Sequence, residues 1–165
     1  MEKREDLREL PNRDDHNCFG CGSTNACGLR MKFFTDEKSL FSWVRIPGHL
    51  CGWDNLAHGG VLSTILDEIM GWTTIHFLKK FAFTHDMAVE FHKPVYVGEE
   101  IRVEARVLEV RGKREATVEG YLYKGENTIC AKSTGTFRLF SADAIARLGV
   151  LKEETIKRFN FLIEP

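Results

Sequence analysis

Residues 52–72, GWDNLAHGGVLSTILDEIMGW, constrain the fold of this chain more than any other stretch, because a loop turns there into a long apolar helix. Apolar residues recur at helical spacing from about residue 59 to about residue 79 and cover more than half of the helix circumference. Such a helix has to be buried by something wide, such as a sheet. Gly59 and Gly60 at its start leave backbone N–H groups uncovered, and the helix dipole adds partial positive charge at that end. The start of the helix therefore suits an oxygen anion.

Alternating apolar and polar residues predict strands on both sides of this helix. The expected strands span residues 29–34, 40–46, 81–93, 101–109, 116–123 and 128–140. Short polar turns join them, and neither a linker nor an internal repeat interrupts the series. Two strands, a long helix and four strands predict an α+β fold, in which one antiparallel sheet of about six strands wraps around one long central helix.

The chain has the length of one domain, and its two ends differ in character from its middle. Residues 1–17 are charged or turn-like and are expected to form an N-terminal appendage, in which a short charged helix ends at Pro11. Residues 18–140 are expected to form the folded domain. Residues 141–165 carry helical spacing on both sides of Gly149, which predicts a tail of two short helices.

The overall charge excludes some classes of partner. Lys and Arg number 23 against 24 Asp and Glu, which gives a formal net charge of -1, so no attraction to nucleic acid or to an anionic membrane is expected. The first ten residues, MEKREDLREL, lack the apolar core of a secretory signal, and no apolar run approaches the length of a membrane span. The expectation is a soluble, cytoplasmic protein.

An odd number of cysteines, in a chain large enough to build its own core, indicates reduced thiols rather than a disulfide framework. The five are Cys18, Cys21, Cys27, Cys51 and Cys130. Cys18, Cys21 and Cys27, together with His16 or Cys51, have the chemistry of zinc ligands. A second Cys-x-x-Cys pair is missing, however, and small thiols also pack well beside glycine. We therefore expect structural packing in this loop, with no metal and no redox cofactor.

Asp67 lies on the polar side of the predicted helix, among small residues that leave space beside its carboxylate. This stripe suits either the close approach of another backbone or a ligand, and the glycine start with His58 before it favours a ligand. Glu68 is about 100° away around the helix and is expected at a surface or interface. Asp67 lies about 12 Å along the helix from Gly59, so one carbonyl cannot touch both in one chain. A site that uses both predicts a homodimer or a dimer of dimers.

Several short motifs occur together in a fixed order. His58-Gly59-Gly60 is followed after six residues by Asp67, CFGCG stands in the N-terminal loop, and FHKPVYVGEEI follows the helix. In these motifs, over roughly residues 18–140, the chain resembles the hot-dog-fold acyl-CoA thioesterases of the PaaI-like (phenylacetate-pathway) type, a branch of the 4-hydroxybenzoyl-CoA thioesterase superfamily. The resemblance implies a hot-dog fold.

The resemblance also implies a reaction, the hydrolysis of an acyl-CoA thioester to the free acid and CoA. In that reaction Asp67 would be the general base or the nucleophile. The N–H groups of Gly59 and Gly60 would form the oxyanion hole for the thioester oxygen. His58 would orient the thioester, and Thr84 would hold the attacking water.

The resemblance leaves three points open. CoA would enter as part of a small-molecule substrate, and Arg111, Lys113 and Arg114 in a hairpin turn are either a solvated turn or ligands of the CoA phosphates. Many relatives place an asparagine six residues before the histidine, where this chain has Gly52. Non-catalytic proteins also use the fold, so acyl-thioester binding or assembly without catalysis stays open as the alternative.

Overall fold

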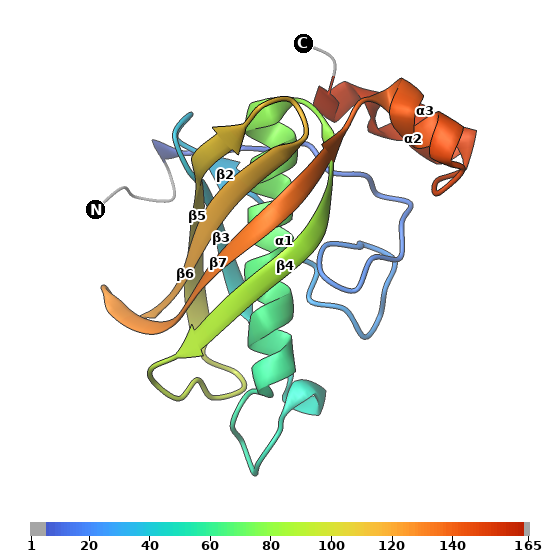
Figure 1. Ribbon diagram of the computed structural model, residues 1–165. Coiled ribbons are helices and arrows are strands. Elements are labelled where there is room, and N and C mark those ends of the chain that lie inside the picture. Colours follow the sequence, from blue (N-terminus) through green and yellow to red (C-terminus); the bar gives the residue numbers. More distant parts are fainter. Residues whose placement is uncertain (1–5, 164–165) are drawn as a thin grey trace.

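The computed structural model describes residues 6–163 and shows one antiparallel sheet with a long helix packed against it (Figure 1). The strands are β1 (Arg8–Glu9), β2 (Phe34–Thr35), β3 (Leu40–Arg45), β4 (Phe81–Phe91), β5 (Glu100–Arg111), β6 (Glu115–Lys124) and β7 (Thr128–Phe140). The helices are α1 (Gly59–Leu78), α2 (Ala142–Leu148) and α3 (Glu153–Ile163), with a 3₁₀ turn η2 at Gly48–Leu50. The strand order across the sheet is β1-β2-β3-β5-β6-β7-β4, so β4 forms one edge.

The predicted fold class is confirmed, with seven strands in place of about six. The additional strand is β1, where a short helix was expected; its residues Arg8 and Glu9 pair with β2. Residues 1–5 of the expected helix lie outside the described residues. The strand expected at residues 29–34 is wrong in extent, because only β2 joins the ladder.

The apolar residues before β2 are buried by the N-terminal loop instead of by a strand ladder. Leu29 and Met31 donate their N–H groups to carbonyls of that loop, over 2.9 and 3.0 Å. Their side chains, with that of Phe33, are nevertheless buried in the main core. The alternation of apolar and polar residues therefore identified the inward face of this segment correctly. Its backbone N–H groups, however, bond to the N-terminal loop and not to a neighbouring strand.

Helix α1 forms the centre of the hydrophobic core. Its buried residues are Val61, Leu62, Ile65, Leu66, Ile69, Met70, Trp72, Thr73 and Thr74. The hydroxyls of Thr73 and Thr74 donate to the carbonyls of Ile69 and Met70, so the polar groups on this face are satisfied within the helix. The helix ends at Lys79, which takes a left-handed conformation with φ 53°. Strands β3 to β7 all contact this helix, which fixes its position against the sheet.

Replacing Ile69 with alanine is expected to destabilise the fold by about 2–5 kcal/mol, because Ile69 is fully buried between α1 and the sheet and its loss leaves a cavity. The measurement is the midpoint of urea unfolding followed by circular dichroism. Thr64→Ala on the polar side of the same helix serves as the control and should change stability by well under half as much. Equal losses in both variants would contradict this assignment of the core face.

The tail forms two helices on either side of Gly149, as its spacing predicts. Ser141 caps α2 by accepting a hydrogen bond from the N–H of Ala144. Ile145 of α2 and Ile156 of α3 bury Phe81 at the start of β4, and α3 also contacts α1. Among residues 6–163, no helix is long and apolar enough to cross a membrane.

Candidate active site

The structure brings Asp67 and Thr84 together. The hydroxyl of Thr84, on β4, donates a hydrogen bond of 2.6 Å to Oδ1 of Asp67, on α1. Both side chains line a cavity of about 240 Å³ between the helix and the edge strand. Gly71 and Ala82 belong to the same wall and leave space beside the carboxylate, as the stripe of small residues predicted. The second carboxylate oxygen of Asp67 is in no hydrogen bond among the described residues and can accept a proton.

A β-bulge in β4 aims Thr84 at the helix. Thr84 pairs with Phe137 and Asp86 with Thr136, so His85 is an extra residue without a partner on β7. Met87 also faces the helix side and packs against the core. In a regular strand Thr84 and Met87 would point to opposite faces, because they are three residues apart. The bulge lets both of them point inward.

The residue next to Asp67 is placed differently from the prediction. Glu68 was expected at a surface or interface, but it is partly buried beneath the N-terminal loop. Nε1 of Trp72 donates a hydrogen bond of 3.2 Å to its Oε1. Burial raises the pKa of the Glu68 carboxyl to about 7. Gly20 of the loop lies so close that a Cβ there would come within 2.4 Å of Oε2 of Glu68.

The two cysteines of the loop lie beside this carboxylate. Sγ of Cys18 is 3.7 Å from each carboxylate oxygen of Glu68. A hydrogen bond from Cys21 lowers the pKa of the Cys18 thiol to about 5, the low range of activated thiols. No local pattern of residues indicates this contact, because Cys18 and Glu68 are 50 residues apart in the chain.

The start of α1 forms a second half of the candidate site. His58 is the N-cap of the helix, and its Nδ1 accepts a hydrogen bond of 2.9 Å from the N–H of Gly60. The amide of Gly60 is therefore occupied in this structure. The N–H of Gly59 is in no hydrogen bond among the residues that the structure describes. Gly59 lines a separate pocket of about 310 Å³ beside Phe91, at the far end of β4.

The two halves stay apart within one chain. The pocket at Asp67 and the pocket at Gly59 share no lining residue. Both contain residues of β4, the first Thr84 and the second Phe91, near opposite ends of the strand. One chain therefore presents two incomplete sites along the same edge of the sheet.

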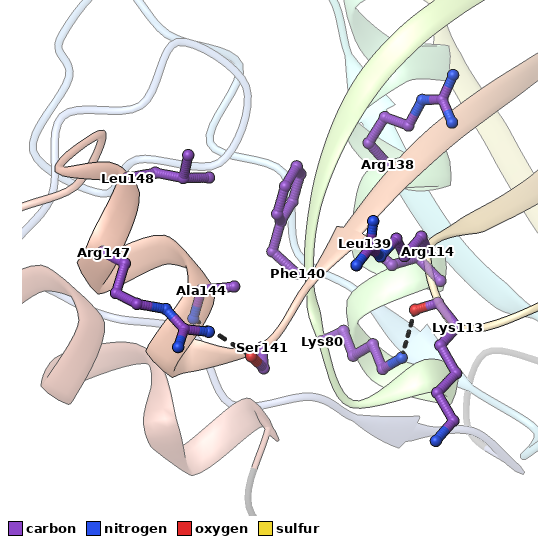
Figure 2. Close-up of a pocket in the computed structure, with 10 residues that line it drawn as sticks. All are labelled: Lys80, Lys113, Arg114, Arg138, Leu139, Phe140, Ser141, Ala144, Arg147 and Leu148. Atoms are coloured by element: carbon purple, nitrogen blue, oxygen red, sulfur yellow. Dashed lines mark hydrogen bonds between the residues drawn. The ribbon is translucent and has the colours of Figure 1, made fainter.

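Only part of the basic hairpin turn lies beside other basic side chains. Lys113 and Arg114 line a third pocket, of about 660 Å³, together with three further basic side chains (Figure 2). These are Lys80, Arg138 and Arg147. Arg111 does not line this pocket, because its guanidinium pairs with Glu109 at 2.9 Å on the hairpin. Sequence reasoning missed the three further cations because they come from different elements.

Comparison with known proteins agrees with this fold. Residues 54–131 match the sequence model of the thioesterase superfamily. A Saccharolobus solfataricus protein that carries the provisional name of an esterase is 32% identical over 112 residues, which cover 67% of this chain. The match spans 66% of that relative, slightly less than two thirds of its length.

Solved structures share the fold. The PaaI protein of the phenylacetic acid degradation operon of E. coli matches with a TM-score of 0.61 and 14% identity, over 68% of this chain and 81% of that one. A hypothetical thioesterase protein of Streptococcus pneumoniae, solved with coenzyme A, matches with a TM-score of 0.59 and 17% identity, over 63% of this chain and 82% of that one. Residues 54–131 therefore resemble the thioesterase superfamily, and the chain has the hot-dog fold. The fold shared with the PaaI protein is the one that the motifs of this chain predict.

Proposed function

We propose that this protein hydrolyses an acyl-CoA thioester to the free acid and CoA. The observation that carries the proposal is the pair of Asp67 and Thr84 at the cavity between α1 and β4, in a chain whose residues 54–131 match the thioesterase superfamily. The Streptococcus pneumoniae protein, solved with coenzyme A, supports CoA thioesters as the substrate class. Because all five cysteines are free thiols, the proposal keeps the cytoplasmic location that the sequence predicts.

In the proposed reaction, Asp67 activates a water molecule or attacks the thioester carbonyl itself. With water, the oxygen bonds to the carbonyl carbon, its proton passes to Asp67, the C–S bond breaks, and CoA leaves as a thiolate that then takes up a proton. With direct attack, a carboxylate oxygen of Asp67 bonds to the carbonyl carbon, the C–S bond breaks, and CoA leaves as a thiolate that takes up a proton. Water then hydrolyses the resulting anhydride, which releases the free acid and restores Asp67. In both routes the hydrogen bond from Thr84 fixes the carboxylate. The N–H of Gly59 would stabilise the negative charge on the carbonyl oxygen.

The proposal requires two copies of the chain, and β4 supplies the means to join them. β4 is the edge strand, and its outer row of N–H and C=O groups can pair with another strand. Thr84 and Phe91 are about 23 Å apart along an extended strand. A two-fold axis through the middle of β4 would pair it antiparallel with its copy. The Asp67 end of one chain would then meet the Gly59 end of the other.

Exposed apolar side chains support this interface. Phe91 and Phe83 on β4 are 54% and 36% exposed, which is unusual for phenylalanine in a sheet. A second copy would cover both and would close the cavity beside the exposed Thr84. We therefore propose a homodimer, or a dimer of dimers, with two composite sites.

The proposed function is tested by incubating the purified protein with acyl-CoAs of short, medium, long and aryl acyl groups. Release of free acid and CoA is measured by chromatography, because the five thiols of the protein would react with a colorimetric thiol reagent. Turnover of at least one substrate class is the expected result. Binding of these esters without turnover would favour the alternative, a non-catalytic acyl-thioester-binding protein. If the protein neither binds nor hydrolyses any of these esters, both the proposed function and the alternative are wrong.

Replacing Thr84 with alanine should lower kcat by about 10–100-fold, since a hydrogen bond to a charged group contributes roughly 1.5–3 kcal/mol. Thr84→Ser keeps the hydroxyl and should restore most of the rate. Steady-state kinetics on the best substrate of the panel give the measurement. A serine variant as slow as the alanine variant would show that the methyl group, and not the hydroxyl, matters.

The basic pocket is proposed to bind the phosphates of CoA. Lys113→Ala combined with Arg114→Ala should raise KM for acyl-CoA roughly tenfold, about 1.4 kcal/mol for two exposed charges. The same acyl group carried on pantetheine lacks the nucleotide phosphates and should show little change in KM. Arg111→Ala is the matched control, because Arg111 lies outside the pocket. Equal effects on both substrates would contradict the assignment.

A further inference from the structure

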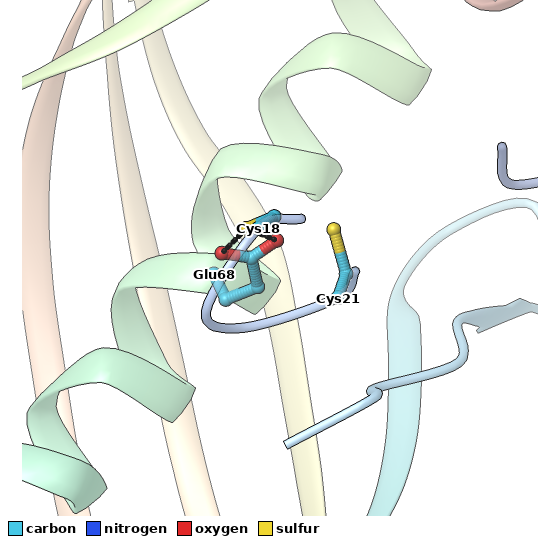
Figure 3. A group of neighbouring side chains, drawn as sticks. All are labelled: Cys18, Cys21 and Glu68. Carbon is cyan, nitrogen blue, oxygen red and sulfur yellow. Dashed lines mark hydrogen bonds between the residues drawn. The ribbon is translucent and has the colours of Figure 1, made fainter. Parts of the chain in front are cut away.

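A group of metal-binding side chains lies where the N-terminal loop crosses α1. The ligand atoms of Cys18, Cys21 and Glu68 all lie within 4.8 Å of one another (Figure 3). Nε2 of His16 lies 3.4 Å from Sγ of Cys21. All four side chains line the same cavity wall. Two thiols and a carboxylate thus converge from a short loop and one helix. The imidazole of His16 lies beside one of the thiols but outside this group of three, so its ring has to rotate to join the other three ligands.

Two contacts among these side chains have the spacing of ligands in a tetrahedral zinc site. With Zn–S bonds of about 2.3 Å and Zn–N or Zn–O bonds of about 2.0–2.2 Å, two ligand atoms of different type lie about 3.6 Å apart. The contact between Cys18 and Glu68 measures 3.7 Å, and that between Cys21 and His16 measures 3.4 Å. The two sulfur atoms need a separation of about 3.8 Å, which small side-chain rotations can reach from within 4.8 Å.

The surroundings hold these ligands in place before any ion arrives. The N–H of Gly22 donates to the carbonyl of Cys18 over 3.0 Å, and the side chain of Asn12 donates to the carbonyl of Cys21 over 3.1 Å. Nε1 of Trp72 donates a hydrogen bond to Oε1 of Glu68 and so holds the orientation of that carboxylate. Thiolate ligands favour zinc over magnesium or calcium.

One polar atom of the group lacks a partner. Nδ1 of His16 is buried and makes no hydrogen bond in the described part of the chain. A buried imidazole nitrogen without a partner is costly unless something else satisfies the ring. Because the ring has to rotate to join the group, Nδ1 can become the ligand atom, and a metal ion would then give it the partner that it lacks.

We infer that His16, Cys18, Cys21 and Glu68 bind one Zn²⁺ ion in a closed, four-coordinate structural site, with release of the thiol protons. The inference is independent of the proposed hydrolysis, because no open position is left for a substrate. It changes the expectation from the sequence in two ways: Glu68 joins the ligand set, and the exposed Cys27 and Cys51 stay outside it. The ion would fasten the N-terminal loop to α1 beside Asp67.

The test is the zinc content of the full-length protein, purified under reducing conditions, incubated with ZnSO₄ and freed of excess metal by gel filtration. Elemental analysis should find about one Zn²⁺ per chain. Cys18→Ser and Glu68→Gln should each lower zinc affinity by at least tenfold in a competition titration with a chromophoric chelator. Cys27→Ser is the matched control and should bind zinc as the parent protein does.

A second measurement covers the case in which a ligand variant fails to fold. In the parent protein, bound zinc should shield two thiols from a thiol reagent, and a chelator should make them reactive again. Substitution with Co²⁺ should give the intense visible absorption of a tetrahedral thiolate site. Zinc content near zero in the folded parent protein, or unchanged zinc affinity in Cys18→Ser, would overturn the inference. Neither readout uses thioesterase turnover, so the two proposals fail separately.

Discussion

Replacing Asp67 with asparagine is expected to lower kcat by about 10²–10⁴-fold, the usual contribution of a positioned general base. Asparagine has nearly the same shape, and its side-chain oxygen can still accept the hydrogen bond from Thr84. The cavity should therefore keep its form, and KM should change little. What disappears is the negative charge that takes a proton from water or attacks the carbonyl, and this loss falls on the chemical step.

The measurement is steady-state turnover of the best acyl-CoA from the substrate panel, with thermal unfolding as a check on the fold. Asp143→Asn, at an exposed position in the first turn of α2, makes the same chemical change away from the cavity and should leave kcat as it is. If Asp67→Asn turns over at the parent rate, the mechanism proposed for this carboxylate is wrong.

Replacing Gly59 with proline should lower kcat by about 10²–10³-fold, the cost of removing one oxyanion donor. Gly59 is the first residue of α1, a position that tolerates proline because its N–H has no partner inside the helix. His58 before it is already in the extended conformation that a following proline requires, with φ -64° and ψ 134°. The substitution therefore removes one N–H group without disrupting the helix.

Gly59→Ala is the control, since it keeps the N–H. A Cβ at this position would meet Cζ of Phe91 at 3.7 Å, an ordinary contact, so the alanine variant should keep most of the activity. Comparable losses in the alanine and proline variants would point to crowding at Phe91 instead of a missing donor.

Mixing the two inactive variants tests the composite site directly. When Asp67→Asn and Gly59→Pro chains are unfolded together and refolded, about half of the dimers contain one chain of each kind. Each mixed dimer has one site with an intact Asp67 and an intact Gly59, so about a quarter of the parent activity should return. A site formed within one chain would recover nothing.

The fold was predictable because its signals are local. Alternation along β5, β6 and β7 and the apolar face of α1 are properties of neighbouring residues, and the structure confirms them. The prediction was wrong for the N-terminal segment, where β1 replaces a short helix. The pairing of β1 with β2 joins residues more than 20 positions apart, which helix-forming composition cannot show.

The candidate site was predictable in part. Spacing in the helix identified Asp67, and the family motif added Thr84, which the structure places within hydrogen-bond distance. The burial of Glu68 under the loop of Cys18 was missed, because it depends on the path of a loop with no regular structure. Three of the five cations of the basic pocket were missed for a similar reason, since they come from separate parts of the chain that meet only in the fold.

Because of the bulge at His85, the number of residues in β4 matters as much as which residues they are. Residues on either side of the bulge follow the same two-residue alternation, but the two series are out of phase by one residue. Deleting His85 would join them into one series, so either Thr84 would leave the helix side or Met87 and Val89 would leave the core. Deleting one residue in this strand would therefore be far more damaging than any substitution at residue 85. Related sequences should accept many different residues at this position, but the strand should keep the same number of residues.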